Sequence, residues 1–222
     1  MCGRFTLTAS GETLAEAFDL PDVPPVAPRY NIAPTQPIVA VRLSPNSGKR
    51  EFTFFHWGLI PSWSKDVKIG SRLINARSET VTEKPSFRSA FKRRRCLIPA
   101  TGFFEWQRQG NKKQPMYIQV KDSQVFAFAG LWETWYGADG SEIDSCTILT
   151  TEPNDLVRDI HNRMPVIIEP VDYSMWLDPG ANPEDGLHLL RPYPADQMLA
   201  LPVSPVVNNP NNDTPECIAP LV

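Results

Sequence analysis

The sequence has few of the residues that build metal sites and disulfide frameworks. Its four cysteines lie far apart with no C-x-x-C pair, and its three histidines are equally scattered. Metal-binding sequences bring such ligands together at short spacings. We therefore expect no metal site and no other cofactor.

Long hydrophobic runs are also missing. No apolar stretch approaches the roughly 20 residues of a membrane span, and the start of the chain lacks the apolar segment of a signal peptide. The hydrophobic content of 41% and the charged content of 21% are typical of soluble globular proteins. We expect a cytoplasmic protein whose cysteines remain reduced.

Proline is abundant, at 23 of 222 residues, which favours many short elements joined by fixed turns. Runs rich in β-branched and aromatic residues predict strands at 37–43, 51–60, 94–107, 115–120, 125–135, 145–151, 164–168 and 197–204. Helical patterns are fewer, at 12–18, 86–92, 153–160, 171–177 and 183–190. This order predicts a single domain over 1–222 with a mainly antiparallel α+β fold. The last residues, from 206 onward, are expected to be irregular chain on the surface.

Charge is divided unevenly along the chain. Residues 1–113 carry 18 Lys and Arg against 9 Asp and Glu, whereas residues 114–222 carry 4 against 16. A basic half suggests a polyanionic partner such as nucleic acid. The alternative is a solvated basic surface, and the run KRRR at 92–95 can equally be the end of a helix.

The most unusual feature is Cys2, directly behind Met1. Removal of Met1 would leave Cys2 with a free α-amine, whose pKa is about 8, beside a thiol, whose pKa is about 8.5. An aldehyde could then be trapped twice, because the amine forms an imine and the sulfur closes on it to give a thiazolidine. The alternative is an ordinary buried cysteine at the start of a strand.

Two stretches could bind an unpaired nucleic acid strand. HWGLIPSW places Trp63 in a turn rich in glycine and proline, where an indole can stack on a base, although tryptophans of this kind also pack into cores. INARSET presents Asn75, Arg77 and Ser78 at a polar turn. Asn75 offers a donor and an acceptor, and Arg77 can hold a phosphate. The alternative is an asparagine that only forms the turn, followed by an ordinary surface arginine.

Two further stretches offer acid–base groups. In GFFEWQ, strand alternation puts Glu105 on the same face as Phe103, and partial burial there would raise the pKa of its carboxyl. In TEPNDLVRDIHNRMPV, we expect a short helix that begins at Pro153 and ends near His161. The helix dipole would then raise the pKa of His161 and favour a proton donor. A solvated carboxylate and a simple helix cap are the alternatives.

Together these stretches resemble one known family. The motifs are MCGRF, RYNIAPTQ, WGLIPSW, INARSET, RRCLIPATGFFEW, QPMYI, FAGLWE, TILTT, IHNRMPVI and the tail VVNNPNND. They occur in the order found in the SOS-response-associated peptidases, also called abasic-site processing proteins, and cover essentially the whole chain. The resemblance implies an α+β fold around a β-barrel-like core, a monomer, and covalent attachment to abasic sites in single-stranded DNA.

The resemblance also implies residue roles. Cys2 would attack the ring-opened sugar, Asn75 would hold the N-terminus or the sugar, and Glu105 and His161 would move protons. A separate set, with less certain contacts, would meet DNA: Arg4, Trp63, Arg77, Ser78 and Arg163. Met1 would be lost by self-cleavage or to an aminopeptidase.

Two other functions remain open. Glutamine amidotransferases with an N-terminal nucleophile also begin Met-Cys-Gly, but they deliver ammonia to an attached synthase domain, for which 222 residues leave no room. A DNA-binding module without chemistry would not need Cys2 at all. Formation of a covalent adduct separates the three functions.

Overall fold

The computed structural model describes residues 2–22 and 26–221. Its α-helices are α1 (Gly11–Phe18), α2 (Arg88–Arg93), α3 (Asp155–Arg158), α4 (Tyr173–Leu177) and α5 (Pro183–His188). Its strands are β1 (Phe5–Leu7), β2 (Arg29–Ile32), β3 (Pro37–Leu43), β4 (Arg50–Trp57), β5 (Asn75–Arg77), β6 (Arg95–Ala100), β7 (Gly102–Gln109), β8 (Lys112–Val120), β9 (Phe126–Tyr136), β10 (Glu142–Thr151), β11 (Met164–Pro165), β12 (Ile167–Ile168) and β13 (Met198–Pro202).

Five strands close into a barrel, as the α+β prediction with a barrel-like core requires. The order is β10-β4-β3-β6-β9, and β9 pairs again with β10 to complete the ring. The pairing of β10 with β4 is parallel, while the other pairings of the ring are antiparallel. Short β5 extends β10 in parallel, pairing Asn75 with Ile148. Closure removes the open edges that a sheet would otherwise expose.

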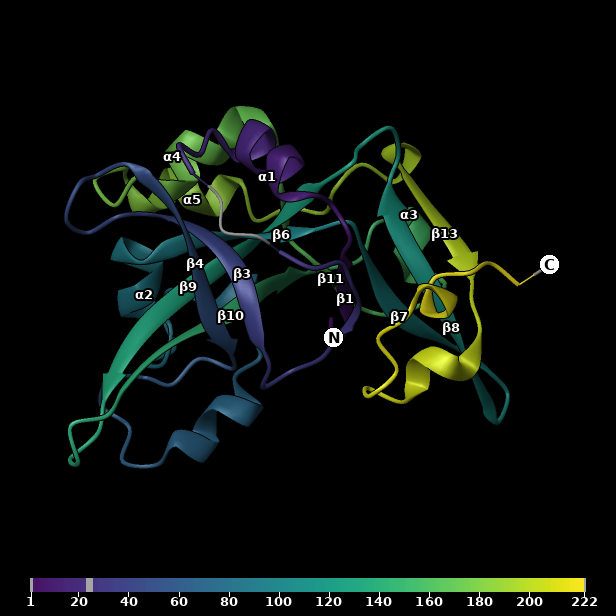
Figure 1. Cartoon of the computed structure of the whole chain (residues 1–222), viewed down its shortest axis with the longest axis horizontal. Coiled ribbons are helices and arrows are strands. Elements are labelled where there is room, and N and C mark those ends of the chain that lie inside the picture. The colour runs from purple at the N-terminus through teal and green to yellow at the C-terminus, as the bar shows by residue number, and fades with distance from the viewer. Residues whose placement is uncertain (1, 23–25, 222) are drawn as a thin grey trace.

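A second, antiparallel sheet lies beside the barrel in the order β13-β8-β7-β1-β2. In Figure 1, β1 runs between the barrel strands and the group formed by β7, β8 and β13, while α1, α4 and α5 gather above the barrel. The N-terminal segment therefore lies where the two sheets meet. This position is set by antiparallel pairing of Phe5 with Phe103 and of Thr6 with Gly102.

Strand alternation in β7 gives the second sheet two apolar faces. Phe103 belongs to the main core and packs edge-on against Phe128 of the barrel at a ring-centroid distance of 5.9 Å. Phe104 points into a smaller cluster with Tyr117 and residues of the C-terminal tail. The predicted division of GFFEWQ between two faces is confirmed, and it places Glu105 on the side of the main core.

The helix predicted at 153–160 is shorter than expected. It spans only Asp155–Arg158, and Asn154 rather than Pro153 caps its start by accepting a hydrogen bond from the backbone N–H of Val157 at 2.9 Å. An asparagine side chain satisfies a free N–H at a helix start better than a proline can. His161 consequently lies three residues beyond the last helical residue.

The C-terminal tail is more ordered than predicted. It contains two 3-10 turns, Pro205–Asn208 and Pro215–Cys217. Val207 and Cys217 are fully buried in the smaller cluster. The tail therefore covers the outer face of the second sheet instead of lying on the surface as solvated chain.

Half of the basic run at 92–95 is used inside the fold. Arg94 pairs with Glu133 at 2.6 Å. Arg95 is buried and donates to the carbonyls of Phe91 at 2.9 Å and Trp176 at 2.5 Å. Only the first two residues of the run, at the end of α2, remain for an external partner.

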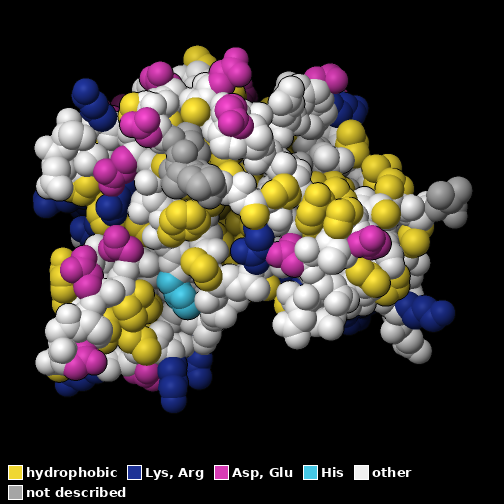
Figure 2. Space-filling view, viewed as in Figure 1, with side chains coloured by type: hydrophobic (Ala, Val, Ile, Leu, Met, Phe, Trp, Pro, Cys, Tyr) yellow, Lys and Arg dark blue, Asp and Glu magenta, His cyan; other side chains and the backbone are white. Residues whose placement is uncertain are grey.

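On the face drawn in Figure 2, Lys and Arg side chains are scattered rather than gathered into one patch: many lie toward the rim and some near the middle, with Asp and Glu side chains among them. The surface is indented at the lower edge, between the barrel part and the part that carries β7 and β8. Among the described residues, no helix is both long and apolar enough to cross a membrane.

Candidate active site

Cys2 lies directly before β1, at the junction of the two sheets, and is fully buried. Two hydrogen bonds hold the segment that carries it. The side-chain Nδ2 of Asn75 donates to the carbonyl of Cys2 at 2.8 Å, and the backbone N–H of Phe104 donates to the carbonyl of Arg4 at 2.9 Å. Asn75 of β5 and the strand β7 thus fix the N-terminal segment from two sides.

The thiol of Cys2 is not ionised in this setting. Burial raises its pKa well above the ordinary value, and the nearby carboxylate of Glu105 raises it further. The ordinary thiol pKa of about 8.5 that was expected for Cys2 from the sequence is therefore wrong for Cys2 as it lies here. The reason is that an apolar environment penalises the charged form of a thiol.

Glu105 is a buried carboxyl, 2% exposed, beside Cys2. Burial raises its pKa to about 7, so the predicted upward shift of this pKa is confirmed. At neutral pH the group is divided between its acid and its carboxylate forms. A carboxyl in this state can both donate and accept a proton.

His161 approaches Glu105 from the segment after α3. Its Nε2 lies 3.8 Å from Oε2 of Glu105, which is longer than a direct hydrogen bond. The backbone N–H of Arg163 donates to Nδ1 of His161 at 3.1 Å. Nδ1 also lies 3.2 Å from the carbonyl oxygen of Arg163, so either tautomer of the neutral ring finds a partner at Nδ1, and Nε2 is the ring nitrogen on the side of Glu105.

The predicted upward shift of the His161 pKa is wrong. Burial lowers this pKa instead. The helix ends at Arg158, and the dipole effect is confined to the last turn of a helix, so desolvation of the half-buried ring dominates. The ring of His161 is therefore mostly neutral at neutral pH, with Nε2 on the side of Glu105.

The predicted DNA-binding residues divide into two groups. The guanidinium of Arg163 is already paired with Glu79 and donates to the carbonyl of Thr150 at 2.6 Å. Arg4 donates from NH1 to Oδ1 of Asn31 and to the carbonyl of Val207, both at 2.8 Å. The side chains of Arg4 and Arg163 therefore bind other parts of the protein, and several of their N–H donors are already in use.

The other group faces solvent. Arg77 is exposed at the end of β5, two residues from Asn75, and Ser78 follows it, half-buried. Trp63 is 59% exposed, whereas Trp57 of the same stretch is buried and donates to the carbonyl of Ile74. One indole of HWGLIPSW therefore packs in the core and the other is available to a partner.

The turn that carries Trp63 is anchored to the barrel. The indole N–H of Trp135 in β9 donates to the carbonyl of Ser64 at 2.7 Å, and Ser145 accepts the backbone N–H of Ile60 at 2.8 Å. The exposed ring of Trp63 thus sits on a turn whose backbone is fixed on both sides. Stacking of a base on this ring therefore requires little ordering of the backbone.

Sequence reasoning missed Asn31 and Asp213. Asn31 is fully buried in β2 and bonds both to Arg4 and to tail carbonyls. Asp213 accepts the backbone N–H groups of Tyr30 and Asn31 and pairs with Arg29. The Asn-rich tail was interpreted as loop composition. The several polar side chains of this tail are the sequence signal that could have indicated hydrogen bonds to another segment of the chain, here the one around Asn31.

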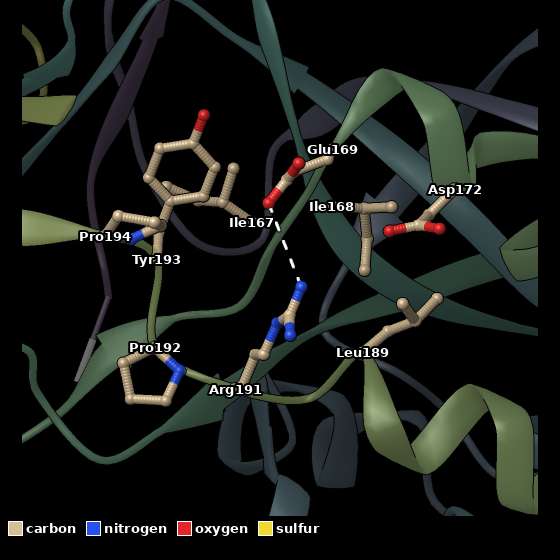
Figure 3. A pocket seen from close by; sticks show the side chains of 9 residues that line it. All are labelled: Ile167, Ile168, Glu169, Asp172, Leu189, Arg191, Pro192, Tyr193 and Pro194. Atoms are coloured by element: carbon tan, nitrogen blue, oxygen red, sulfur yellow. Dashed lines mark ion pairs between the residues drawn. The ribbon is translucent and has the colours of Figure 1, made fainter.

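A pocket on another part of the surface offers no second site of useful size. It is formed by β12 and the segment after α5, and an ion pair joins Arg191 and Glu169 across it at 3.9 Å (Figure 3). Its volume of about 10 Å³ is close to the lower limit for a single water. None of the predicted site residues lines it.

Known proteins match this chain over almost its whole length. The family model described as SOS response associated peptidase (SRAP) matches residues 1–210. The abasic site processing protein YoqW of Bacillus subtilis (strain 168) is 47% identical over 223 residues, covering 98% of this chain and 99% of that protein. The abasic site processing protein HMCES of Xenopus tropicalis is 37% identical over 201 residues, covering 80% of this chain and 59% of that protein.

A solved structure shows that the fold is shared as well. The crystal structure of a protein from Bacteroides thetaiotaomicron superimposes with a TM-score of 0.90 at 28% identity and covers 100% of both chains. The match of the family model over 1–210, together with the YoqW relative, agrees with the motifs that begin at Met1 and end in the tail. The chain belongs to the SOS response associated peptidase (SRAP) family.

Proposed function

We propose that this protein processes abasic sites in single-stranded DNA by forming a covalent crosslink through Cys2. One observation carries the proposal: four separate parts of the chain meet at one place, where Asn75 bonds to the carbonyl of Cys2 at 2.8 Å, Glu105 interacts electrostatically with the Cys2 thiol, and His161 lies 3.8 Å from Glu105. The printed names of the relatives, abasic site processing proteins, point to the same lesion. The crosslink shields the lesion during the response to DNA damage.

The proposed chemistry uses the α-amine of Cys2, so Met1 must first be removed. The amine attacks the aldehyde carbon of the ring-opened sugar, and loss of one water gives an imine. The S–H of Cys2 then adds across the C=N bond, with sulfur bonding to carbon and the proton going to nitrogen. No free thiolate has to accumulate, which agrees with the raised pKa of this thiol.

Three neighbours assist these steps. Asn75 holds the carbonyl of Cys2 at 2.8 Å and thereby orients the nucleophile. Glu105, whose pKa is about 7, accepts the thiol proton and returns it to the imine nitrogen. His161 in its protonated form delivers a proton from Nε2 to the departing water and is left as the neutral ring, and a carboxylate at Glu105, 3.8 Å away, stabilises the charged ring before the transfer.

DNA binding is assigned to the exposed group. Trp63 stacks on a base beside the lesion, while Arg77 and Ser78 contact phosphate. Arg4 and Arg163, with their internal partners, contribute positive charge near the site and meet phosphate with the donors left to them. We expect a monomer that acts on chromosomal DNA in the cytoplasm.

Loss of Met1 is the entry step. Either an aminopeptidase removes it, or Cys2 assists cleavage of its own peptide bond, which would account for the peptidase in the family description. Intact-mass measurement of protein expressed with and without a co-expressed aminopeptidase distinguishes the two routes. A reactive protein that retains Met1 would contradict the thiazolidine mechanism.

A denaturing gel tests the proposal. Purified protein is incubated with an oligonucleotide that contains one abasic site, either single-stranded or in a duplex, and with the undamaged strand. We expect a heat-stable shifted band with the abasic single strand only, and none with Cys2→Ala unless borohydride traps an imine. A stable adduct from Cys2→Ala would overturn the role of sulfur. Glutaminase activity without an adduct would favour the amidotransferase, and binding without an adduct a DNA-binding module.

A further inference from the structure

The N-terminal segment is tied to the opposite end of the chain by one buried side chain. Nδ2 of Asn31 lies within hydrogen-bond distance of three tail carbonyls, those of Val207 at 3.2 Å, Asn209 at 3.0 Å and Asn212 at 2.7 Å. Its Oδ1 accepts from NH1 of Arg4 at 2.8 Å. A 0% exposed asparagine therefore uses both ends of its amide to join two distant segments.

The tail is fixed on the other side of the same residue. Asp213 accepts the backbone N–H of Asn31 at 3.0 Å and that of Tyr30, and it pairs with Arg29. The tail side chain of Asn212 donates to the carbonyl of Val206 at 2.9 Å, which closes the segment on itself. Residues 206–213, here called the tail clamp, thus present a rigid row of carbonyls to Asn31.

The side chain of Arg4 is held in place by Asn31 and by the tail clamp. Its NH1 is shared between Asn31 and the carbonyl of Val207, and its guanidinium lies 5.8 Å from the ring centroid of Trp106. Trp106 in turn donates to Asn208 of the tail clamp at 2.7 Å. The backbone of Arg4 accepts from Phe104, the neighbour of Glu105 in β7.

We propose that Asn31 is a positioning residue that locks the tail clamp onto Arg4 and so fixes Cys2 at its place beside Glu105. The proposal rests on the proposed crosslinking function. Cys2 is two residues from Arg4. If the Arg4 side chain loses its contacts with Asn31 and the carbonyl of Val207, the segment that carries the nucleophile becomes less firmly held. Misplacement of reacting groups by about 1 Å can cost a rate of the order of 100-fold.

Two substitutions separate the two ends of the amide. Asn31→Ala removes both. Asn31→Asp keeps an acceptor for Arg4 but turns an oxygen toward the tail carbonyls, which then lose the hydrogen bonds that Asn31 donates. If the tail clamp matters, Asn31→Asp is as defective as Asn31→Ala; rescue by Asn31→Asp would overturn the role of the tail clamp. Asn211→Ala is the matched control, because its side chain is exposed and its tail position is adjacent.

The first readout is crosslinking of an abasic single-stranded oligonucleotide under single-turnover conditions over a range of protein concentrations. We expect both Asn31 variants to lower the maximal rate about 10- to 100-fold, with a half-saturating concentration within about twofold of wild type and Asn211→Ala unchanged. A wild-type maximal rate in a folded Asn31→Ala protein would overturn the proposal. So would a loss confined to the half-saturating concentration, which would mark Asn31 as a binding residue.

The second readout needs no DNA. Hydrogen exchange at the amide of Phe104 reports opening of its bond to Arg4, and we expect it to be at least about 10-fold faster in the Asn31 variants, with unchanged exchange in β3 of the barrel. Equal acceleration in β3 would indicate general destabilisation and contradict the proposal. If wild-type protein forms no crosslink, the proposed function fails while this measurement still decides the positioning.

A milder variant covers the case in which Asn31 cannot be changed without unfolding. Asp213→Asn keeps the shape of the side chain and one acceptor but loses the charge that Arg29 holds. We expect Asp213→Asn to lower the maximal crosslinking rate less than the Asn31 variants do, and to accelerate hydrogen exchange at the amide of Phe104 less than they do. A folded Asp213→Asn protein with wild-type values of both would overturn the proposal.

Discussion

Oε2 of Glu105 and Nε2 of His161 lie 3.8 Å apart, one on β7 and the other after α3. Burial moves their pKa values in opposite directions, that of Glu105 up to about 7 and that of His161 below its ordinary value. Glu105 therefore changes between acid and carboxylate in the pH range in which a cell operates, whereas the ring of His161 is mostly neutral there.

The raised pKa of Glu105 predicts a pH-dependent stability. Between the unfolded value of about 4.3 and the folded value of about 7, the folded state holds a proton that the unfolded state has lost. The contribution of Glu105 to the free energy of unfolding therefore falls as pH rises through this window and is constant above it. Glu105→Gln should match wild type near pH 4 and be more stable by up to roughly 4 kcal/mol at pH 8.

Urea unfolding of both proteins from pH 4 to pH 8 measures this difference. Taking the difference between variant and wild type removes the contributions of the other titrating groups. A difference that does not change with pH would show that Glu105 is solvated and that its pKa is ordinary.

His161→Ala is expected to slow crosslinking by roughly 10²–10⁴-fold because it removes a proton donor, while affinity for undamaged single strands stays within about twofold. Rate profiles between pH 5.5 and 8.5 assign the groups. The inflection near pH 7 should persist in His161→Ala and disappear in Glu105→Gln. The assignment is contradicted if the inflection disappears only in the histidine variant.

Arg77→Ala should reduce the salt dependence of binding to undamaged single strands. Loss of one phosphate contact lowers the slope of log affinity against log salt by about 0.7 for single strands. Arg191→Ala removes the same charge from the pocket of Figure 3, where Arg191 pairs with Glu169, and should leave the slope unchanged. Equal slopes for the two variants would remove Arg77 from the DNA interface.

Trp63→Ala should weaken binding of single-stranded DNA by about 1–3 kcal/mol, the value of one stacked base, with little change in thermal stability because the ring is 59% exposed. Tyr136, which is 68% exposed, provides the control, and Tyr136→Ala should bind normally. Fluorescence anisotropy with a labelled strand measures both affinities. Normal binding by Trp63→Ala would exclude stacking at this position.

Much of the fold could be predicted from local patterns. A run of β-branched residues predicted the strand at 37–43 to the residue, and alternation predicted the division of Phe103 and Phe104 between two clusters. Closure of β9 on β10, and the second sheet that brings β1 beside β7, depend on pairings between distant segments, which no local period encodes. A single domain over 1–222 stays a prediction, since the buried residues form two clusters.

The residues of the candidate site could be predicted from the sequence, but the burial and the protonation states of their side chains could not. Glu105 follows from alternation, because its face could be deduced. The state of Cys2 and His161 could not, because desolvation depends on packing by segments far away in the sequence. The internal partners of Arg4 and Arg163 were missed for the same reason: Asn31 and Glu79 lie far from them along the chain.

The central claim is that Cys2 forms a thiazolidine with the abasic sugar. The most direct test is the intact mass of the product from protein and an abasic single strand without borohydride, followed by mapping of the modified peptide. We predict a heat-stable species whose mass is the sum of Met1-free protein and DNA less one water, with the DNA remnant on Cys2. A product attached elsewhere, or no covalent product from protein that has lost Met1, would contradict the account.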